Sequence, residues 1–325
     1  MKNILIIMPN FYSYSEAIGS EFQRRGFKVT LFYEQPHPIK YLILRKLEGI
    51  LHTKMVYELF LYSMYRKIKK QGVLFDFLLV IRGNILNERF LDKVAKHCLT
   101  DNANKVYYTW DSFKFLNHRG TLGDYFDKKF SFDLDDVETN NKWEFLPLFY
   151  TEQYDIDKKK NMYPYEYDLS CIAGFNEYRY EMLCDIQRNN PNLNMKVCLY
   201  ISKELYDIKK KNSPTFKSIN QEWLIFDYLS SEEVSDINLK SKAILDITDQ
   251  NQAGLSMRTI ESVGLKRKIV TNNANVMKYD IRENVFVITK ENIIIPQIWI
   301  DKMFIMSDEN RRNYSLSEWV NKIIS

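Results

Sequence analysis

Residues 243–273 read AILDITDQNQAGLSMRTIESVGLKRKIVTNN, and this stretch decides the fold of the chain. Its pattern predicts in order a buried strand, a polar loop, a helix and a second strand, at Ala243–Ile247, Thr248–Gly254, Leu255–Val263 and Ile269–Thr271. Such a unit is the building block of a parallel α/β sheet. Ligands of these sheets bind beyond the carboxyl ends of the strands, where a loop leads into a helix. We therefore expect the site at Asp249–Ser256.

The start of the predicted helix suits a phosphate group. Its unpaired N–H groups and the positive end of its dipole attract anions, and Gly254 lets a ligand approach the backbone closely. Arg258 and Glu261 lie three residues apart and so share one helix face, where one could pair with a phosphate and the other with sugar hydroxyls. The alternative is that these two side chains form a solvated ion pair on a surface helix.

The segment DQNQAGLSMRTIESVG resembles the donor-binding segment of bacterial glycosyltransferases of the GT-B type, in particular the CgeB-like group and enzymes of surface polysaccharide synthesis. The resemblance implies two Rossmann-like α/β/α domains that face each other across a cleft. It implies a nucleotide sugar bound by the carboxyl-terminal domain and an acceptor bound mainly by the amino-terminal domain. The donor-binding positions expected from it, or from the neighbouring strand ends, are Gly174, Arg179, Gln252, Gly254, Leu255, Ser256, Arg258, Glu261, Thr271 and Asn272.

The length of 325 residues is enough for two domains, each with its own core. The first is expected at residues 1–150 and opens with a β-α-β unit over Lys2–Tyr33. A polar, charged and aromatic linker follows at residues 151–167, then a second α/β domain at residues 168–300. The terminal helices at 301–325 are expected to pack back on the first domain. No GxGxxG motif occurs, which argues against a dinucleotide-binding Rossmann domain.

The composition is that of a soluble globular protein, with 45% hydrophobic and 27% charged residues. A net charge of +4 from 46 basic and 42 acidic residues is too balanced for a dedicated nucleic-acid binder. The absence of an apolar run of membrane-spanning length and of a signal peptide predicts a cytoplasmic protein. Pro36–Gly72 combines helical apolar spacing with many basic residues. It predicts either peripheral contact with the inner membrane surface or a solvated face over an ordinary core.

Neither a metal nor another cofactor is expected. The four cysteines and four histidines lack metal-binding spacings, so buried reduced thiols are the better interpretation. Asp133 and Asp135 in FDLDD form a DxD pattern, which would fit a metal-dependent GT-A enzyme, but the second α/β half argues against that architecture. Helix N–H groups and Arg258 could stabilise the leaving diphosphate instead.

Asp111 is the first candidate for a general base. It directly follows a predicted strand beside Trp110, and a carboxylate next to an aromatic wall has its pKa raised by desolvation. The segment YYTWDS also resembles a recurring segment of the same enzymes. The alternative is that Asp111 caps the next helix. Glu16 is the competing base, although its spacing from Ser13 also predicts a capping box.

The sequence thus predicts a metal-independent cytoplasmic glycosyltransferase. It would move a sugar from a nucleotide-activated donor to a saccharide or lipid-linked acceptor in the synthesis of bacterial lipopolysaccharide, O-antigen or capsule. The alternatives are a nucleotide-sugar epimerase or hydrolase of the same fold, and a non-catalytic protein that binds a nucleotide sugar or glycan within a polysaccharide assembly complex. On this interpretation, Arg258→Ala or Glu261→Ala abolishes donor binding and leaves thermal unfolding nearly unchanged.

Overall fold

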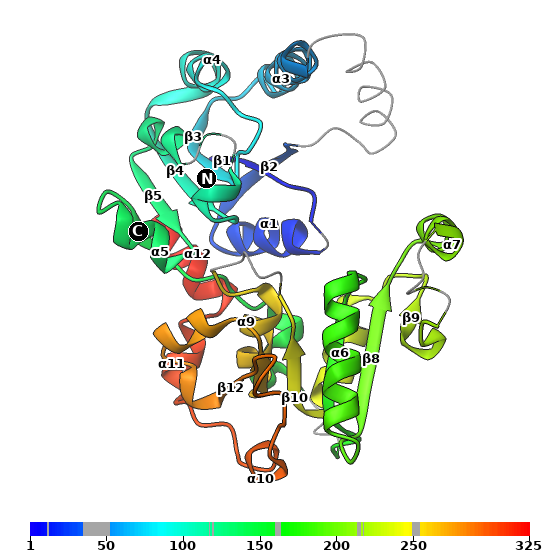
Figure 1. The fold of residues 1–325 in the computed structure, drawn as a ribbon. Coiled ribbons are helices and arrows are strands. Elements are labelled where there is room, and N and C mark those ends of the chain that lie inside the picture. Colours follow the sequence, from blue (N-terminus) through cyan, green and yellow to red (C-terminus); the bar gives the residue numbers. More distant parts are fainter. Residues whose placement is uncertain are drawn as a thin grey trace. The chain divides into compact units, whose positions relative to one another are not determined.

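The computed structural model describes residues 1–11, 13–34, 53–116, 118, 120–159, 164–212, 216, 218–248 and 254–325. The chain forms two compact units, one of Met1–Pro147 with Trp319–Ser325 and the other of Leu148–Glu318. Each unit contains one six-stranded sheet with helices against it (Figure 1). The first unit ends a few residues before the linker that the sequence predicts at residues 151–167.

The first sheet is entirely parallel and has the order β2-β1-β3-β4-β5-β6. Its strands are β1 (Lys2–Met8), β2 (Phe27–Tyr33), β3 (Phe75–Ile81), β4 (Leu99–Thr109), β5 (Lys128–Ser131) and β6 (Glu144–Phe145). Strand β6 is only two residues long, although apolar residues continue after it. Leu146 still donates a hydrogen bond to the Ser131 carbonyl at 3.0 Å, but Pro147 has no N–H with which to continue the ladder.

Helices cover both faces of this sheet (Figure 1). They are α1 (Tyr14–Arg24), α3 (Thr53–Lys69), α4 (Glu88–Cys98), α5 (Leu134–Thr139) and α12 (Leu316–Ile324). Alternate residues of the central strands, such as Leu5 and Leu78, pack with α3 and α4. Trp319 of α12 lies edge-on to Tyr108 with 5.0 Å between ring centroids, so the end of the chain contributes to the first unit.

The second sheet is also parallel and has the order β12-β11-β10-β7-β8-β9. Its strands are β7 (Tyr167–Gly174), β8 (Met195–Tyr200), β9 (Leu224–Ile225), β10 (Ser241–Asp246), β11 (Lys268–Thr271) and β12 (Val285–Val287). The chain runs outward from β7 through β8 to β9 and returns on the other side of β7 with β10. The strand order therefore reverses between β7 and β10, and ligands of open α/β sheets bind at the carboxyl ends of such a strand pair.

The helices of the second unit are α6 (Glu177–Asn189), α7 (Lys203–Asn212), α8 (Ser231–Leu239), α9 (Met257–Gly264), α10 (Gln297–Ile300) and α11 (Asp308–Arg312). Leu169 and Leu245 point to the face that α6 covers, whereas Ser170 and Asp246 point to the face of α8 and α9. Helix α7 lies in a polar stretch for which the sequence predicts no helix. The buried residue of α7 is Tyr206, so the helix lacks the apolar stripe from which an amphipathic helix is predicted.

The carboxyl end of α9 packs closely against residues 150–157. A Cβ at Gly264 would lie 2.3 Å from the Tyr154 carbonyl oxygen, which only a glycine permits. Arg311 of α11 is fully buried beside this contact and forms ion pairs with Asp155, at 2.9 Å, and with Asp157. These contacts fix the carboxyl end of α9, opposite to the helix start where the sequence predicts the ligand. Among the described residues, no helix is both long and apolar enough to span a lipid bilayer.

Candidate functional site

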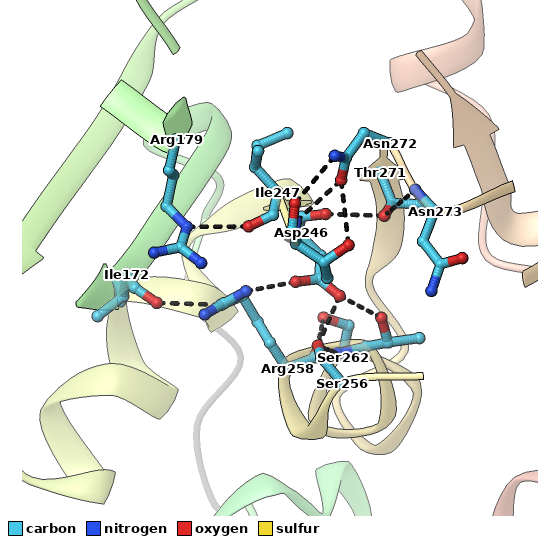
Figure 2. A network of polar contacts seen from close by, with 12 residues as sticks. Ile172, Arg179, Asp246, Ile247, Ser256, Arg258, Ser262, Thr271, Asn272 and Asn273 are labelled. Atoms are coloured by element: carbon cyan, nitrogen blue, oxygen red, sulfur yellow. Dashed lines mark hydrogen bonds and ion pairs between the residues drawn. The ribbon is translucent and has the colours of Figure 1, made fainter. Parts of the chain in front are cut away.

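Asp246 lies at the centre of the polar network at the carboxyl end of β10 (Figure 2). Its carboxylate is buried and accepts hydrogen bonds from the Ser256 hydroxyl at 2.6 Å and the Thr259 hydroxyl at 2.5 Å. It also forms an ion pair with Arg258. Sequence reasoning missed this residue, although a single carboxylate in the apolar run AILDI is itself a signal, because a buried charge needs partners.

Arg258 connects the two strands at which the strand order reverses. One guanidinium nitrogen pairs with Asp246 of β10, and Nε donates to the Ile172 carbonyl of β7 at 3.0 Å. Desolvation lowers the pKa of Arg258, but the surrounding acidic groups, with Asp246 first among them, together raise it above its ordinary value. The alternative of a solvated surface pair with Glu261 is wrong, because Arg258 pairs with the buried Asp246 carboxylate and the Glu261 residue is only 5% exposed.

The predicted phosphate-binding helix is α9, which begins at Met257 rather than at Leu255. Ser256 is its N-cap residue and accepts a hydrogen bond from the Thr259 N–H at 3.2 Å. Leu255 is buried, and the Gly254 carbonyl accepts from the Asn273 amide at 3.2 Å. Gln252 lies outside the described residues. The cap leaves the first N–H groups of α9 at the carboxyl edge of the sheet, where an anion could meet them.

Glu261 faces the protein interior rather than the solvent. It lies near Tyr154, whose pKa is raised by burial and also by the charge of Glu261. Its predicted contact with sugar hydroxyls therefore requires a ligand that reaches this buried position.

Thr271 and Asn272 fasten the loop that follows β10. The Thr271 hydroxyl donates to the Asp246 carbonyl at 2.7 Å. The Asn272 side chain accepts from the Thr248 N–H at 2.9 Å and donates to the Thr248 carbonyl at 3.0 Å and to the Tyr178 hydroxyl at 3.2 Å. Asn272 does not have a left-handed backbone. These bonds give both side chains a structural role at the edge of the site.

Arg179 lies across the network from Asn272 (Figure 2). Arg179 donates from Nε to the Ile247 carbonyl at 2.9 Å and from Nη1 to the Gly174 carbonyl at 2.5 Å, so its guanidinium joins the ends of β7 and β10. The charges of Arg179 and Arg258 both act on the buried Cys171 thiol, which places both cations beside the same strand. A Cβ at Gly174 would meet no atom of the described residues within 4 Å, so open space adjoins this strand end.

A cavity of about 390 Å³ adjoins the same edge of the second sheet. Residues that follow β10, β11 and β12 line it together with two side chains of α6: Tyr178, Met182, Thr248, Asn272, Asn273, Ala274, Asn275, Ile288, Thr289, Lys290 and Glu291. The Asn272 side chain belongs both to this cavity and to the network beside Asp246. A cavity of this size is at the lower end of the range for small-molecule sites.

Asp111, in the first unit, forms an ion pair with Arg82, with 2.6 Å between Oδ2 and Nε. The short helix that follows has Ser112 at its N-cap position, so the alternative interpretation of Asp111 as a cap is wrong. Glu16 is exposed on the first turn of α1. The predicted capping box is also wrong, because Ser13 has a helical backbone and makes no capping hydrogen bond, whereas an N-cap residue is normally extended.

Asp111 lines a cavity of about 200 Å³ together with Met8, Pro9, Phe11, Arg82 and Trp110. The predicted aromatic wall is present, since the Trp110 ring lies 6.3 Å from that of Phe11 and 6.0 Å from that of Tyr14.

Sequence reasoning missed Glu34, which is buried at the end of β2 behind this cavity. Burial raises its pKa to about 7, against the opposing effect of Arg82. A carboxyl directly after a strand was its only signal in the sequence.

The carboxylates of FDLDD are engaged with the protein. Asp133 accepts from Ser112 and, as the N-cap residue of α5, from the Asp135 N–H at 3.1 Å. Asp136 accepts from the Ser131 hydroxyl at 2.9 Å, and burial raises its pKa to about 6. In the part of the chain that the structure describes, no cluster of His, Cys, Asp and Glu side chains is arranged to hold a metal ion.

A comparison with solved structures identifies the architecture. AviGT4, a glycosyltransferase involved in avilamycin A biosynthesis, superposes with a TM-score of 0.60 at 8% identity, covering 100% of this chain and 96% of its own. An α-glucosyltransferase in complex with UDP and a 13-mer DNA gives 0.59 at 15% identity, with 99% and 96% covered. The fold is GT-B.

The UDP-GlcNAc 2-epimerase of Neisseria meningitidis, bound to UDP-GlcNAc, has the same fold, with a TM-score of 0.58, 9% identity and coverage of 100% and 98%. The GT-B fold therefore includes both glycosyltransferases and epimerases among the neighbours of this chain. A scan against protein-family models and a search of curated proteins gave no match.

Proposed function

We propose that the protein is a glycosyltransferase that binds a nucleotide-sugar donor in its second unit. The donor diphosphate would lie above Gly174 and before the first turn of α9. The open space at Gly174, flanked by the guanidinium groups of Arg179 and Arg258, is the observation that supports this position most strongly. Structural neighbours that hold UDP or UDP-GlcNAc support the class of ligand.

The arrangement suits the departure of a nucleoside diphosphate. Arg258 is fixed by Asp246 and Ile172 before any ligand arrives, so no side chain must be reorganised to meet the developing negative charge. The first N–H groups of α9 add partial positive charge at the same edge. In this proposal the two arginines and the helix start stabilise the leaving group, a task that a metal ion performs in other transferases.

Asp111 is the proposed general base for the acceptor hydroxyl. One of its oxygens is held by Arg82, and its side chain is 39% exposed at a cavity with aromatic walls. Aromatic rings stack on sugar faces, which supports a saccharide acceptor in the first unit. Glu16 does not line this cavity and is the weaker candidate.

We further propose a role in bacterial surface polysaccharide synthesis, near the CgeB-like group, on the cytoplasmic face of the membrane. The support is the resemblance of residues 249–264 and the surface of α3. There Leu59 is 60% and Tyr62 50% exposed, on a helix whose last turn carries Arg66, Lys67 and Lys69. Exposed apolar side chains beside cations favour contact with anionic lipid, where a lipid-linked acceptor would be found.

An epimerase or hydrolase is the second candidate, because an epimerase of the same fold superposes almost as well as the transferases. The two classes differ in their need for an acceptor. Turnover of the nucleotide sugar by the purified protein without an acceptor would favour the epimerase or hydrolase, and tight binding without any turnover would favour a non-catalytic partner.

The test is a thermal-shift panel of UDP, GDP, CMP and dTDP sugars on wild type and Gly174→Ala. Binding to the native state alone raises the melting temperature. We expect one nucleotide to stabilise the wild type, and Gly174→Ala to bind it about tenfold more weakly, since an added methyl fills the space that the diphosphate needs.

Without ligand, Gly174→Ala should melt at the same temperature as the wild type, because its Cβ comes within 4 Å of no atom in the described ranges. Gly19→Ala in α1 of the first unit is the matched control. Its added Cβ would make one contact, at 3.9 Å, and the variant should bind the donor normally. Normal donor affinity in Gly174→Ala would refute the proposed diphosphate position.

A further inference from the structure

We propose that Arg82 is a positioning residue that aims the carboxylate of Asp111 into the cavity of the first unit, and that Glu34 holds Arg82 in place. This inference rests on the proposed function, in which Asp111 is the base. It adds two residues, each at a strand end, to the machinery of the acceptor site.

The backbone at Arg82 is unusual. Its φ is 69°, a left-handed conformation that costs a non-glycine residue about 1 kcal/mol or more and persists only where the surroundings enforce it. Here the Arg82 N–H donates to the Tyr108 carbonyl at 2.8 Å, and the Arg82 carbonyl accepts from the Tyr107 hydroxyl at 2.6 Å. The next residue, Gly83, is also left-handed, and a Cβ there would lie 2.9 Å from Val80.

This sharp turn at the end of β3 places the Arg82 side chain between two carboxylates. Nε contacts Asp111 at the end of β4 at 2.6 Å, and Nη1 contacts Glu34 at the end of β2 at 3.4 Å. Glu34 is itself fixed by the Asn84 N–H at 2.9 Å. The exposed fractions of the two carboxylate side chains differ sharply, 1% for Glu34 and 39% for Asp111. The buried carboxylate therefore anchors the arginine, and the arginine holds the accessible one.

A purely structural arginine would not need this arrangement. The cavity beside it is walled by Met8, Pro9, Phe11 and Trp110, so Arg82 and Asp111 are the charged groups among its described lining residues. A carboxylate that accepts a proton from an acceptor hydroxyl must be held within a narrow range of positions, and an ion pair to a rigidly placed guanidinium achieves that.

The charge of Glu34 gives the arrangement a pH signature. Burial raises the pKa of Glu34 to about 7, so Arg82 has two anionic partners above this pH and only Asp111 below it. In the part of the chain that the structure describes, the other titratable groups on this side are Tyr107, whose pKa burial raises, and His118, whose pKa burial lowers. Both are neutral near pH 7, which leaves Glu34 as the group whose ionisation redistributes the hydrogen bonds of Arg82.

The experiment compares wild type, Arg82→Lys and Glu34→Gln in acceptor-dependent transfer, with the donor found by the thermal-shift panel. A lysine keeps the charge but cannot span both carboxylates. We expect Arg82→Lys to lower kcat about 100-fold with the donor Kd unchanged. In Glu34→Gln, which is nearly isosteric, the change of kcat with pH around 7 should disappear. Lys105→Met, which breaks an exposed pair with Asp127, is the control and should behave as wild type.

The outcomes separate this inference from the proposed function. If the wild type transfers sugar and Arg82→Lys keeps its kcat, or Glu34→Gln keeps the wild-type pH profile, the positioning role is refuted and the function stands. If the wild type binds a donor but transfers sugar to no acceptor, both are refuted. If Arg82→Lys melts well below wild type and loses donor binding as well, Arg82 is structural and the inference falls.

Discussion

Replacing Arg258 with alanine should destabilise the second unit strongly. Arg258 is the cationic partner of Asp246, a carboxylate that is 1% exposed in the middle of the sheet. The substitution leaves that charge buried with the hydroxyls of Ser256 and Thr259 as its donors among the described residues, and it also frees the Ile172 carbonyl. The sequence alone predicted the opposite, a nearly unchanged thermal unfolding, because it gave Arg258 no structural partner.

The size of the effect follows from the burial of the pair. Removing one partner of a buried ion pair costs about 3–5 kcal/mol. Two remaining hydrogen bonds and the 20% exposure of the Arg258 side chain place this case near the lower end, at about 3 kcal/mol. For a unit of this size, that corresponds to a fall in melting temperature of roughly 6–12 °C.

Urea unfolding at pH 7, followed by fluorescence and circular dichroism, measures this free energy. The double variant Asp246→Asn/Arg258→Met removes both charges and should recover much of the loss, because an uncharged pair leaves no buried ion. Arg179→Ala, which removes hydrogen bonds to the carbonyls of Ile247 and Gly174, should cost about 1 kcal/mol. A loss below about 1 kcal/mol in Arg258→Ala would contradict the argument, since the smallest penalty expected for a broken buried pair is about 3 kcal/mol.

Two further predictions concern stability. The pKa of Glu34 is about 7 in the folded protein against an ordinary 4.5, so its contribution to stability is complete below pH 4.5 and is lost as the pH rises through 7. The unfolding free energy of wild type relative to Glu34→Gln should therefore fall by about 3 kcal/mol over this range. Urea titrations at several pH values measure it. A difference in unfolding free energy that does not change with pH would contradict burial of an ionisable carboxyl. Gly264→Ala should lower stability by about 1–3 kcal/mol, because its Cβ would lie 2.3 Å from the Tyr154 carbonyl. Equal melting temperatures of Gly264→Ala and Gly174→Ala would show that α9 does not pack as described.

The fold could be predicted from the sequence to a large extent, because the apolar periodicity of a helix or strand lies within one short segment of the chain. Both strands and the helix expected within residues 243–273 form, as β10, α9 and β11, and Ser230 forms a capping box with Glu233, three residues further on. The same Ser-x-x-Glu spacing fails at Ser13 because capping depends on the backbone angles of the first residue, which the spacing does not specify.

Much of the candidate site could not be predicted, because it depends on contacts between distant strand ends. The sequence indicated Arg258, yet its partner Asp246 comes from the preceding strand, and the Ile172 carbonyl lies 86 residues away. Glu34 and Asp111 are 77 positions apart in the sequence, and Arg82 forms an ion pair with each of them. No sequence pattern indicates the left-handed backbone of Arg82. The resemblance to GT-B enzymes gave the correct fold, while the link to CgeB-like and surface-polysaccharide enzymes stays a prediction.

A crystal structure of the protein with the nucleotide sugar selected by the thermal-shift panel tests the central claim most directly. The account predicts the diphosphate above Gly174, with phosphate oxygens about 3 Å from the guanidinium of Arg179 or Arg258 and from the first N–H groups of α9. A diphosphate bound elsewhere on the second unit, or on the first unit, would contradict it.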